Sequence, residues 1–591
     1  MEGERSTALR HRALRATLLI VGVVVGLGAL WLLLGGMVAQ RSLSTAGENL
    51  QRARNAIEAG DRSTARKELG AAQRATARAR FMTSGPVWRT AAAVPWVGRT
   101  PRAVSTVAQV SDAVARLVLP PLADVAADID VGALRTADGI DLVPLQRAAP
   151  ALELAQHRML ALRQVTDAIH GPLIWPVGAR VGTLRQAVTD LTGVIDVGVK
   201  ATALIPPMMG TGGTRTYLLA VQNPAEARGT GGLLGAYGVV EAVEGRVTIR
   251  DIGPNSALRD TARLRLDVPP DFVSLYGNDP ALWANANLSP YFPYAARIWL
   301  RLWELQHQER LDGVIAVDPI ALGRIVGATQ PVTLPDGTRL TGTSAANFLM
   351  RDVYERFPSF EQSTERDRLL AGIGAAMARN LFGQGGDVGE LVTGVRKSVR
   401  QGRILVYSDH RDEQGLLAGT PISGAPTRTR APQLLVVVNN GAANKLDFYL
   451  DRSVRWQLGR CVEGSRRSRV TVALRNDAPA VGLPAYVVGN RDLPRDGKAV
   501  PPGTNRVLVT VFSTHAARLV GAELDDVELS IRRGRERGQT VTAFTVDLAS
   551  GQTRIAVLEF DEPARPERPT LAVQPLVRQQ RSVVEAEQCA T

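Results

Sequence analysis

The chain has few of the residues that build metal and redox centres. Its 591 residues include only two cysteines, Cys461 and Cys589, and no CxxC pair. A zinc site built on cysteines is therefore excluded. The six histidines are scattered along the chain and form neither an HExxH motif nor a cluster. We accordingly expect neither a bound metal nor a cofactor.

Acidic residues are also under-represented. The chain has 57 Asp and Glu residues against 70 Lys and Arg residues, so its formal net charge is +13. Such a charge can indicate nucleic-acid binding. Here the basic residues, nearly all arginine, are spread along the whole chain, and no basic patch contains interleaved aromatic residues. We predict no nucleic-acid partner. A basic surface is instead attracted to anionic lipid or cell-wall polymer.

One long hydrophobic run occurs, residues 16–39 (ATLLIVGVVVGLGALWLLLGGMVA), and it contains no charge. As a helix it is about 36 Å long, enough to cross a hydrocarbon core of ~30 Å. The alternatives are a buried core helix and a cleaved signal peptide. A signal peptide has a shorter apolar run and a small-x-small cleavage site, whereas Met37-Val38-Ala39 is followed here by Gln40-Arg41. We therefore expect an uncleaved single-pass anchor embedded in the lipid bilayer.

The charges around this run predict its orientation. The basic residues that precede it are Arg5, Arg10, His11, Arg12 and Arg15. Only Arg41 follows closely, so the positive-inside tendency keeps residues 1–15 in the cytoplasm and places the bulk of the chain outside the cell membrane. In that oxidising compartment Cys461 and Cys589 could form a disulfide that ties the tail, residues 576–591, to the preceding domain. Two unrelated thiols are the alternative.

Residues 42–205 have the composition of an α-helical stalk. Helical spacing over 42–81, interrupted at Gly60-Asp61, predicts an antiparallel hairpin whose second helix is capped by Asp61. Periodic Leu, Val and Ala predict further helices over 102–128, 146–169 and 177–204. Packing explains these stripes better than a cofactor site does, so we expect this region to provide spacing and support.

Residues 208–415 alternate between strand and helix patterns, which predicts an α/β domain. The expected strands are 215–222, 234–243, 246–252 and 311–318, with turns at Asn223-Pro224 and Glu244-Gly245. The expected helices are 291–309, 319–326, 343–354 and 364–382. Residues 431–575 contain seven short alternating segments, which predict a β-sandwich domain. A sandwich of this kind more often supports or binds than catalyses.

The densest candidate for chemistry is the glycine-rich segment 223–238 (NPAEARGTGGLLGAYG). Its glycines let the backbone bend and present N–H groups to an anion, and Arg228 could hold a phosphate. The spacing matches neither the dinucleotide-binding fingerprint nor the P-loop. A tight turn and a closely packed strand are the alternative interpretation.

Two further charged sets follow. Arg250 and Asp251 end a strand, where ligands of α/β sheets usually bind, and Arg259 and Asp260 lie just beyond. The other set is Arg351, Asp352, Glu355, Arg356, Glu365, Arg366, Asp367 and Arg368. Surface salt bridges produce the same spacing. The hypothesis of a binding site therefore requires that these sets meet in one cleft at the strand ends.

Three segments resemble the bacterial domain-of-unknown-function 4012 family: LLAVQNPAEARGTGGLLGAYGVV, LDGVIAVDPIALGRIVGATQPV and VVVNNGAANKLDFYLDRSV. The order of elements over 216–382 is also similar to that of the LytR-CpsA-Psr proteins, membrane-anchored enzymes that transfer polymers from polyprenyl pyrophosphate carriers to the cell wall. LTGTSAANFLMRDVYERF and TERDRLL resemble segments of that family. The resemblance implies arginines that grip a pyrophosphate and acidic residues that hold Mg²⁺. The matching positions are Arg228, Arg250 with Asp251, Arg351 and Arg366.

The chain departs from that pattern in ways that matter for chemistry. An expected Arg-x-Asp reads Arg228-Gly-Thr, and a Pro-Arg-Asp reads Ile249-Arg250-Asp251. A lost carboxylate removes charge that would neutralise a pyrophosphate through Mg²⁺. We therefore expect a LytR-CpsA-Psr-like fold in an envelope protein that binds envelope glycan, a lipid-linked polymer or a protein partner. The alternative is a polyprenyl-pyrophosphate-dependent glycopolymer transferase, the one case in which Mg²⁺ would be required, so enzymatic activity stays open.

Overall fold

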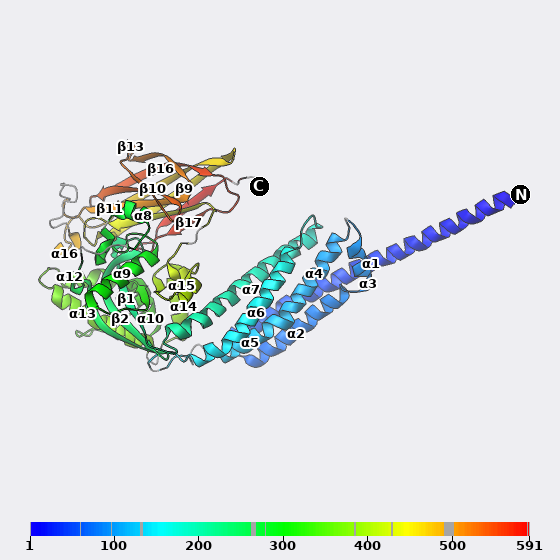
Figure 1. Cartoon of the computed structure of the whole chain (residues 1–591), viewed down its shortest axis with the longest axis horizontal. Helices are drawn as coiled ribbons and strands as arrows, with labels where there is room; N and C mark the ends of the chain where they lie inside the picture. The colour runs from blue at the N-terminus through cyan, green and yellow to red at the C-terminus, as the bar shows by residue number, and fades with distance from the viewer. Residues whose placement is uncertain are drawn as a thin grey trace. The chain divides into compact units, whose positions relative to one another are not determined.

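The computed structural model describes residues 2–58, 61–95, 97–129, 134–136, 138–261, 267–277, 279–382, 386–426, 429–489, 501–587 and 589. The chain forms two compact units. The first comprises Met1–Leu134 and Asp141–Pro206, and the second comprises Arg135–Ile140 and Pro207–Thr591. Helices build the first unit, and the second combines an α/β region with strand-rich sheets (Figure 1).

The helices of the first unit are α1 (Glu2–Glu58), α2 (Arg62–Met82), α3 (Pro86–Ala93), α4 (Arg99–Ala113), the π-helix η1 (Val114–Val118), α5 (Leu119–Asp128), α6 (Val143–Asp167) and α7 (Trp175–Met208). Among the described residues, one helical stretch is long and apolar enough to cross a membrane, Val23–Ala56 of α1. Its large apolar side chains from Val23 to Met37 are exposed in the protein, apart from the half-buried Leu32. This pattern is the one expected of a membrane anchor.

Helices α1 and α2 pack through small residues at heptad spacing. The buried positions of α1 are Gly35, Ala39, Ser42, Ala46, Asn49, Ala53 and Ala56. Those of α2 are Ala65, Ala72, Thr76 and Ala79. Alternating steps of four and three residues keep one seam of each helix against the other. Asp61 accepts hydrogen bonds from the backbone N–H groups of Ser63 and Thr64, so the predicted cap of the second helix is confirmed.

The α/β region is centred on a five-stranded sheet in the order β3-β2-β1-β4-β7. Its strands are β1 (Arg215–Arg228), β2 (Gly231–Val243), β3 (Arg246–Pro254), β4 (Gly313–Val317) and β7 (Ile404–Ser408). Strands β1 and β4 run parallel, and the other neighbours are antiparallel. The first four strands were predicted, whereas the short run of β7 was missed.

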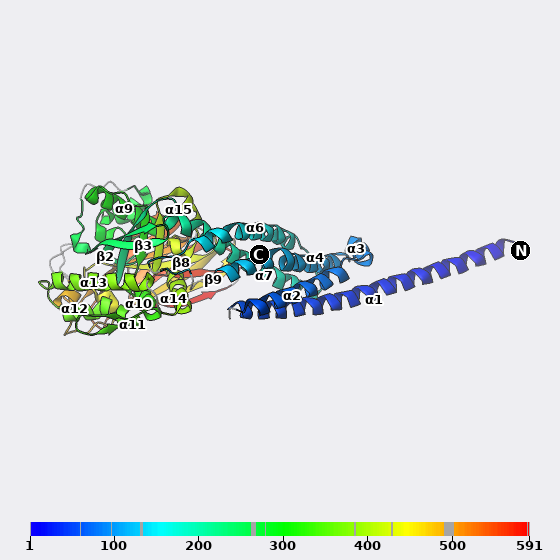
Figure 2. The same cartoon turned by 90° about the horizontal axis from the view of Figure 1, so that it is seen from below.

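The helices of this region are α8 (Pro270–Tyr276), α9 (Phe292–His307), α10 (Pro319–Ala328), α11 (Gly342–Asn347), the π-helix η5 (Phe348–Asp352), α12 (Val353–Arg356), α13 (Ser363–Phe382), α14 (Val388–Arg400) and α15 (Arg411–Leu417). The sheet lies between α9 on one face and the layer of α10, α13 and α14 on the other (Figure 2). Leu218 and Ala220 of β1 pack in the same core cluster as Trp299 of α9. The alternate residues Leu219 and Val221 face the other layer.

Local signals predicted one turn of this sheet correctly and the other incorrectly. Glu244 and Gly245 have φ angles of 47° and 84° and form the expected β2–β3 turn. The turn predicted at Asn223-Pro224 is wrong, because β1 continues through both residues. Its pairing with β2 instead shifts register between Asn223 and Ala227. Irregular pairing with β2 thus carries β1 past the local turn signal, beyond residues 217–221 that pair with β4.

Two sheets follow, in the orders β13-β12-β16-β10-β9-β18 and β14-β15-β11-β8-β17. Their strands are β8 (Gln433–Asn440), β9 (Leu450–Val462), β10 (Ser465–Asn476), β11 (Asn505–His515), β12 (Arg518–Leu524), β13 (Val527–Glu528), β14 (Arg532–Glu536), β15 (Gln539–Leu548), β16 (Thr553–Pro563), β17 (Thr570–Val573) and β18 (Arg581–Ala586). One hydrophobic cluster, which includes Trp456, Phe544 and Phe560, contains residues of both sheets.

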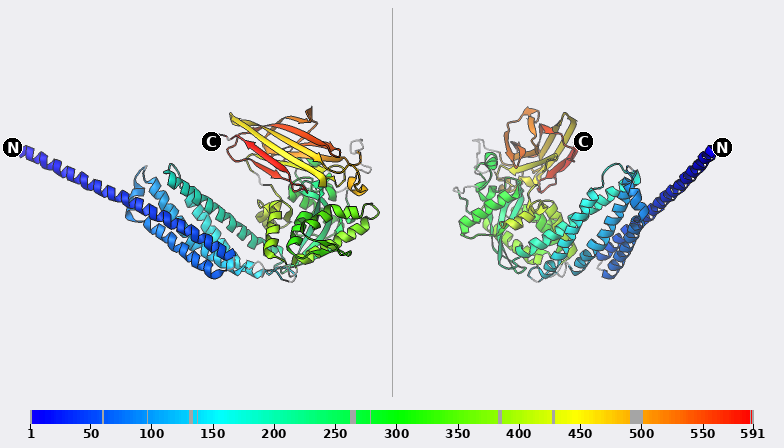
Figure 3. Two further views of the ribbon diagram at one scale, coloured as in Figure 1. Left: turned by 180° about the vertical axis from the view of Figure 1, so that it is seen from behind. Right: turned by 45° about the vertical axis from the view of Figure 1, so that its right-hand side comes forward.

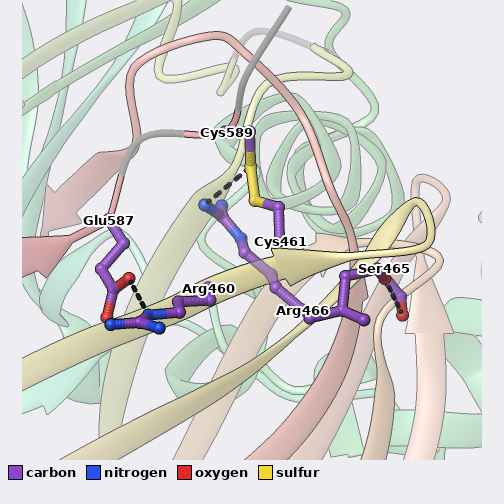
Figure 4. Close-up of a disulfide and its surroundings, with 7 residues drawn as sticks. Arg460, Cys461, Ser465, Arg466, Glu587 and Cys589 are labelled. Atoms are coloured by element: carbon purple, nitrogen blue, oxygen red, sulfur yellow. Dashed lines mark hydrogen bonds and ion pairs between the residues drawn. A yellow bond between two sulfur atoms is a disulfide. The ribbon is translucent and has the colours of Figure 1, made fainter.

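Cys461 and Cys589 form a disulfide, with their Cα atoms 5.4 Å apart (Figure 4). Cys461 belongs to β9, and Cys589 follows the edge strand β18, which pairs in parallel with β9. Every residue of β18 is exposed, so few side-chain contacts hold this strand in place. The disulfide therefore fastens the end of the chain to the sheet.

A buried carboxylate connects β14 to the segments around α8 and α9. Glu536 is 3% exposed, and its oxygens accept hydrogen bonds from the Ser289 hydroxyl at 2.6 Å and the Tyr276 hydroxyl at 3.1 Å. Burial raises the pKa of Glu536 to about 7, although both hydrogen bonds oppose that shift.

This carboxylate gives a testable pH dependence of stability. Between the ordinary pKa of 4.5 and the raised pKa of about 7, the unfolded chain releases the Glu536 proton while the folded protein retains it. The free energy of unfolding should therefore fall as the pH rises through this window, by up to about 3 kcal/mol, and then level off. Urea titrations of the full-length protein in detergent should show this fall, and Glu536→Gln should remove it. An equal pH dependence in both proteins would contradict the assignment.

Candidate functional site: an apolar cavity with a cationic edge

An apolar cavity of about 390 Å³ lies between the five-stranded sheet and the layer of α10, α13 and α14. Its apolar lining from the strands includes Leu219, Val221, Val240, Val247, Ile249, Ile315, Val317 and Ile404. Its apolar lining from the helical layer includes Leu322, Ile325, Leu349, Leu370, Ile373, Met377 and Val395. Protein interiors are normally close-packed, so an apolar space of this size is typical of a ligand pocket.

Glycine at position 374 helps to keep this space open. Gly374 lies on α13 and lines the cavity, and a Cβ atom built there would meet no atom within 4 Å. The alternation of β1 directs Leu219 and Val221 toward the same space from the other side. Branched side chains on the strands and a missing side chain on the helix thus shape the cavity.

The polar residues that line the cavity are Asn223, Tyr237, Tyr354 and Asp367. The Asn223 side-chain amide donates a hydrogen bond to the Tyr354 hydroxyl at 3.0 Å. The Tyr354 ring stacks on the ring of Tyr486, with centroids 5.4 Å apart. Tyr354 therefore joins the cavity to a second group of buried side chains.

Two buried cations, Arg366 and Lys445, lie against these tyrosines. The Arg366 Cζ atom is 4.0 Å from the ring centroid of Tyr486 and 5.5 Å from that of Tyr354. The Lys445 Nζ atom is 5.1 Å from both centroids. Arg366 is only 4% exposed and Lys445 only 8%. Cation–π attraction compensates part of the cost of burying such charges.

The two cations differ in how fully they are paired. Lys445 donates to a Glu226 carboxylate oxygen at 3.1 Å. Arg366 has Asp367 as its carboxylate neighbour, at 3.4 Å, and its Nη1 atom makes no hydrogen bond with any residue that the structure describes. A buried guanidinium with a free N–H group is a suitable partner for an anion. A phosphate suits it, because two phosphate oxygens can each accept a hydrogen bond from the planar guanidinium.

Electrostatics keeps this cluster in a defined protonation state. Burial lowers the pKa of Lys445, but Glu226 together with the two tyrosines outweighs burial, so the net pKa is raised and the ammonium stays charged. Burial raises the pKa of Tyr354, against the opposing effect of Lys445. Tyr354 consequently stays protonated and can donate a hydrogen bond.

The Asn-rich segment after β8 positions Lys445. Asp447, fully buried, accepts hydrogen bonds from the Ala227 backbone N–H and from the side-chain amides of Asn440 and Asn505, each at 2.8 Å. These bonds hold the segment against the end of β1, where Glu226 lies. The sequence predicted this segment as part of the β-sandwich strands and of a family resemblance, and its role was hidden because its partners on β1 lie more than 200 residues away.

Arg228 does not line the cavity. Its guanidinium donates hydrogen bonds to the carbonyl oxygens of Ala284 and Ala227, both at 2.9 Å, and of Asn440 at 3.2 Å. It also lies 3.7 Å from the Glu226 carboxylate and is 5% exposed. These contacts tie β1 to β8 and to the segment before α9, which is a structural arrangement.

The glycines beside Arg228 allow close backbone packing. A Cβ atom at Gly229 would lie 2.3 Å from the Leu288 carbonyl oxygen, and one at Gly232 would lie 2.1 Å from the Asn223 carbonyl carbon. Neither position has room for a larger residue. The geometry favours the closely packed strand over an anion-binding loop.

Arg250 and Asp251 pair with each other, and Arg250 also pairs with Glu309, the second residue after α9. Ile249 lines the cavity, so Arg250, the next residue along β3, faces the α9 side of the sheet. Arg250 and Asp251 thus lie on the α9 face of the sheet, whereas Arg366 lies on the opposite face, with the cavity.

Arg351 pairs with Asp352 at 2.7 Å and with Glu355 at 3.7 Å, and it packs over the ring of Phe448. It does not line the cavity. Arg366 does not line the cavity either, but of the five residues proposed from the sequence it is the one that packs on a cavity-lining ring, that of Tyr354.

The described residues do not fit a magnesium site. Asp251 lies with Arg250 on the α9 side, whereas Asp367 lines the cavity and pairs with Arg366. No group of three or more His, Cys, Asp or Glu side chains suited to a metal ion occurs in the described part of the chain. Mg²⁺ is usually held by carboxylates together with substrate phosphates. We therefore assign Mg²⁺ no part in the function of this protein.

Residues 212–354 match a family model described as "Protein of unknown function (DUF4012)". The match spans β1 to α12 and so includes Glu226 and Tyr354. It supports the resemblance to that family, and no curated protein matches the chain.

Solved structures give only remote likenesses. They include a mutant two-domain M1 zinc metallopeptidase bound to L-arginine (14% identity, 20% of this chain, 22% of that chain, TM-score 0.12). They also include a mutant M1 zinc metallopeptidase from Deinococcus radiodurans bound to a Tyr-Ser-Ala substrate (14% identity, 21% of this chain, 23% of that chain, TM-score 0.12). This chain spans about a quarter or less of the length of each, and neither likeness carries an argument about fold or function.

Proposed function

We propose that this protein is a membrane-anchored envelope protein whose α/β region binds the apolar chain of a phosphate-bearing lipid, such as a polyprenyl-linked glycan. The observation that carries the proposal is the apolar cavity next to the Arg366–Lys445 cluster. Each buried methylene contributes about 0.8 kcal/mol, so roughly ten buried carbons contribute about 8 kcal/mol before the cost of ordering the ligand. The cavity thus supplies affinity, and the cations supply selection of the head group.

The unpaired Nη1 group of Arg366 is the proposed contact for the head group. Charge-assisted hydrogen bonds to a phosphate are roughly twice as strong as neutral ones. Lys445, already paired with Glu226, holds the tyrosines in place. Arg228, Arg250, Asp251 and Arg351 have other partners in the protein, so we assign them no contact with the ligand.

The proposed topology places the N-terminus in the cytoplasm and the second unit outside the cell, because basic residues precede the apolar part of α1. The two strand-rich sheets act, in this proposal, as a β-sandwich that presents Lys445 to the Tyr354 and Tyr486 rings. We favour lipid binding over glycopolymer transfer as the function. The residues expected for a transferase are distributed over both faces of the α/β sheet and so do not form one site. The resemblance to LytR-CpsA-Psr proteins agrees with a polyprenyl ligand.

Photolabelling tests this proposal. Full-length protein in lipid nanodiscs would be exposed to a polyprenyl phosphate with a diazirine on its chain, and labelled peptides would be identified by mass spectrometry. We expect label in α13 and β4, with label in α1 as an internal control for lipid contact. The same chain without phosphate should label α13 and β4 more weakly. Label confined to α1 would refute the binding function.

A further inference from the structure

We propose that the protein has a second contact with the membrane, a collar of side chains around the base of α1 that inserts into the head-group layer. The collar consists of Phe81, Val94, Val97, Ile174 and Trp175. They belong to the connections between α2, α3 and α4 and to the start of α7. The inference rests on the proposed anchoring by α1 and is independent of the cavity.

The α2–α3 turn packs against the apolar part of α1. A Cβ atom at Gly35 would lie 3.1 Å from both the Met82 carbonyl oxygen and the Trp88 Nε1 atom. Gly35 lies inside the apolar run 16–39, so the bundle begins before that run ends. The helix from residue 16 to residue 34 already measures about 28 Å, close to the ~30 Å hydrocarbon core. Gly35 therefore lies at the outer boundary of the hydrocarbon.

The α6–α7 connection lies at the same end of the bundle. Leu173 and Val177 pack in a cluster with Leu43 of α1. A Cβ atom at Gly171 would lie 3.1 Å from an Nη1 atom of Arg99, the first residue of α4. Figure 3 shows these connections at the end of the bundle from which the N-terminal part of α1 projects. The α2–α3 connection is thus at the level where α1 leaves the hydrocarbon, and the α6–α7 connection clusters with a residue of α1 about 12 Å farther out.

The side chains at this end suit a membrane interface. The exposed fractions are 78% for Phe81, 49% for Val94, 70% for Val97, 60% for Ile174 and 84% for Trp175. Large apolar groups exposed to this extent are unfavourable in water, and aromatic rings are enriched where a membrane meets water.

Charged residues complete the pattern. Arg89 and Arg99 are exposed on the same segments and can contact lipid phosphates. At the other end of α2, the exposed residues Asp61, Arg62 and Ser63 are polar. The start of α2 is therefore polar, whereas the α2–α3 turn and the start of α7 expose large apolar side chains.

Site-directed fluorescence in nanodiscs tests the collar. Because the two native cysteines are bonded to each other, a single new cysteine can be labelled selectively. Labels would be placed by Phe81→Cys and Trp175→Cys, with Val194→Cys, an exposed position farther along α7, as the matched control. A lipid carrying a quencher near its head group should quench the two collar labels roughly fivefold more than the control. Equal quenching at all three positions would overturn the collar.

A fourth label separates this inference from the anchoring on which it rests. Leu30 is exposed on the apolar part of α1. A label introduced by Leu30→Cys should be quenched by a lipid whose quencher lies deep in the acyl region. Loss of that signal would refute the anchoring itself, whereas its presence without quenching at 81 and 175 would refute the collar alone.

Discussion

Gly374→Leu is expected to block lipid binding and to make the protein more stable. A leucine side chain at this position of α13 would occupy the cavity without meeting the backbone, since a Cβ atom there has no neighbour within 4 Å. The ligand would lose the space that its chain needs, so we expect labelling of α13 and β4 to fall at least about tenfold. Replacing a helical glycine should stabilise α13 by about 0.8–1 kcal/mol. Photolabelling and thermal unfolding of the variant measure both effects.

Gly372→Leu is the matched control, because it makes the same chemical change two residues earlier on α13. Gly372 is exposed, does not line the cavity and also has open space around its Cβ position. It should give a similar gain in helix stability with unchanged labelling. If Gly374→Leu retained full labelling, or if both variants lost it equally, the cavity would not be the binding site.

Lys445→Met should destabilise the protein by about 3–5 kcal/mol, the largest effect on stability that we expect. The lysine is buried and pairs with the buried carboxylate of Glu226 at 3.1 Å. Removing the lysine leaves the buried Glu226 carboxylate with only the more distant Arg228 guanidinium, at 3.7 Å, to compensate its charge. Urea unfolding of the full-length protein in detergent measures this loss.

A double-mutant cycle provides the control for this pair. Adding Glu226→Gln to Lys445→Met removes the orphaned charge and should restore most of the lost free energy of unfolding. Additive effects of the two substitutions would show that the pair is not coupled, and Lys445 would then have no assigned role in holding the cluster.

Part of the fold was readable from short-range patterns. The cap at Asp61, the turn at Glu244-Gly245 and the helix that begins after Asp318 each depend on residues within a few positions of each other. The path of β1 through Asn223-Pro224 was not readable, because its irregular pairing with β2, a strand that follows in the chain, determines it. The buried positions of α1 at heptad spacing start at Gly35, inside the apolar run 16–39. Nearly every residue of that run is apolar, so the heptad spacing could not be recognised there.

The candidate site was less accessible to prediction. Arg366 could be proposed because it lies in a short motif on one helix. Lys445 and Glu226 are 219 positions apart, and no local signal joins them. A cavity is a space that side chains leave empty, so the residues that line it read as ordinary core positions. Arg228 and Arg250 resembled ligand-binding residues because sequence does not show which partners a buried arginine already has.

The most direct test of the account is an experimental structure of the full-length protein with a bound polyprenyl phosphate. We predict continuous density for the chain between Ile315 of β4 and Ile373 of α13, with a phosphate oxygen within hydrogen-bonding distance of Arg366. A structure in which these side chains close on each other, with the lipid bound elsewhere, would contradict the central claim.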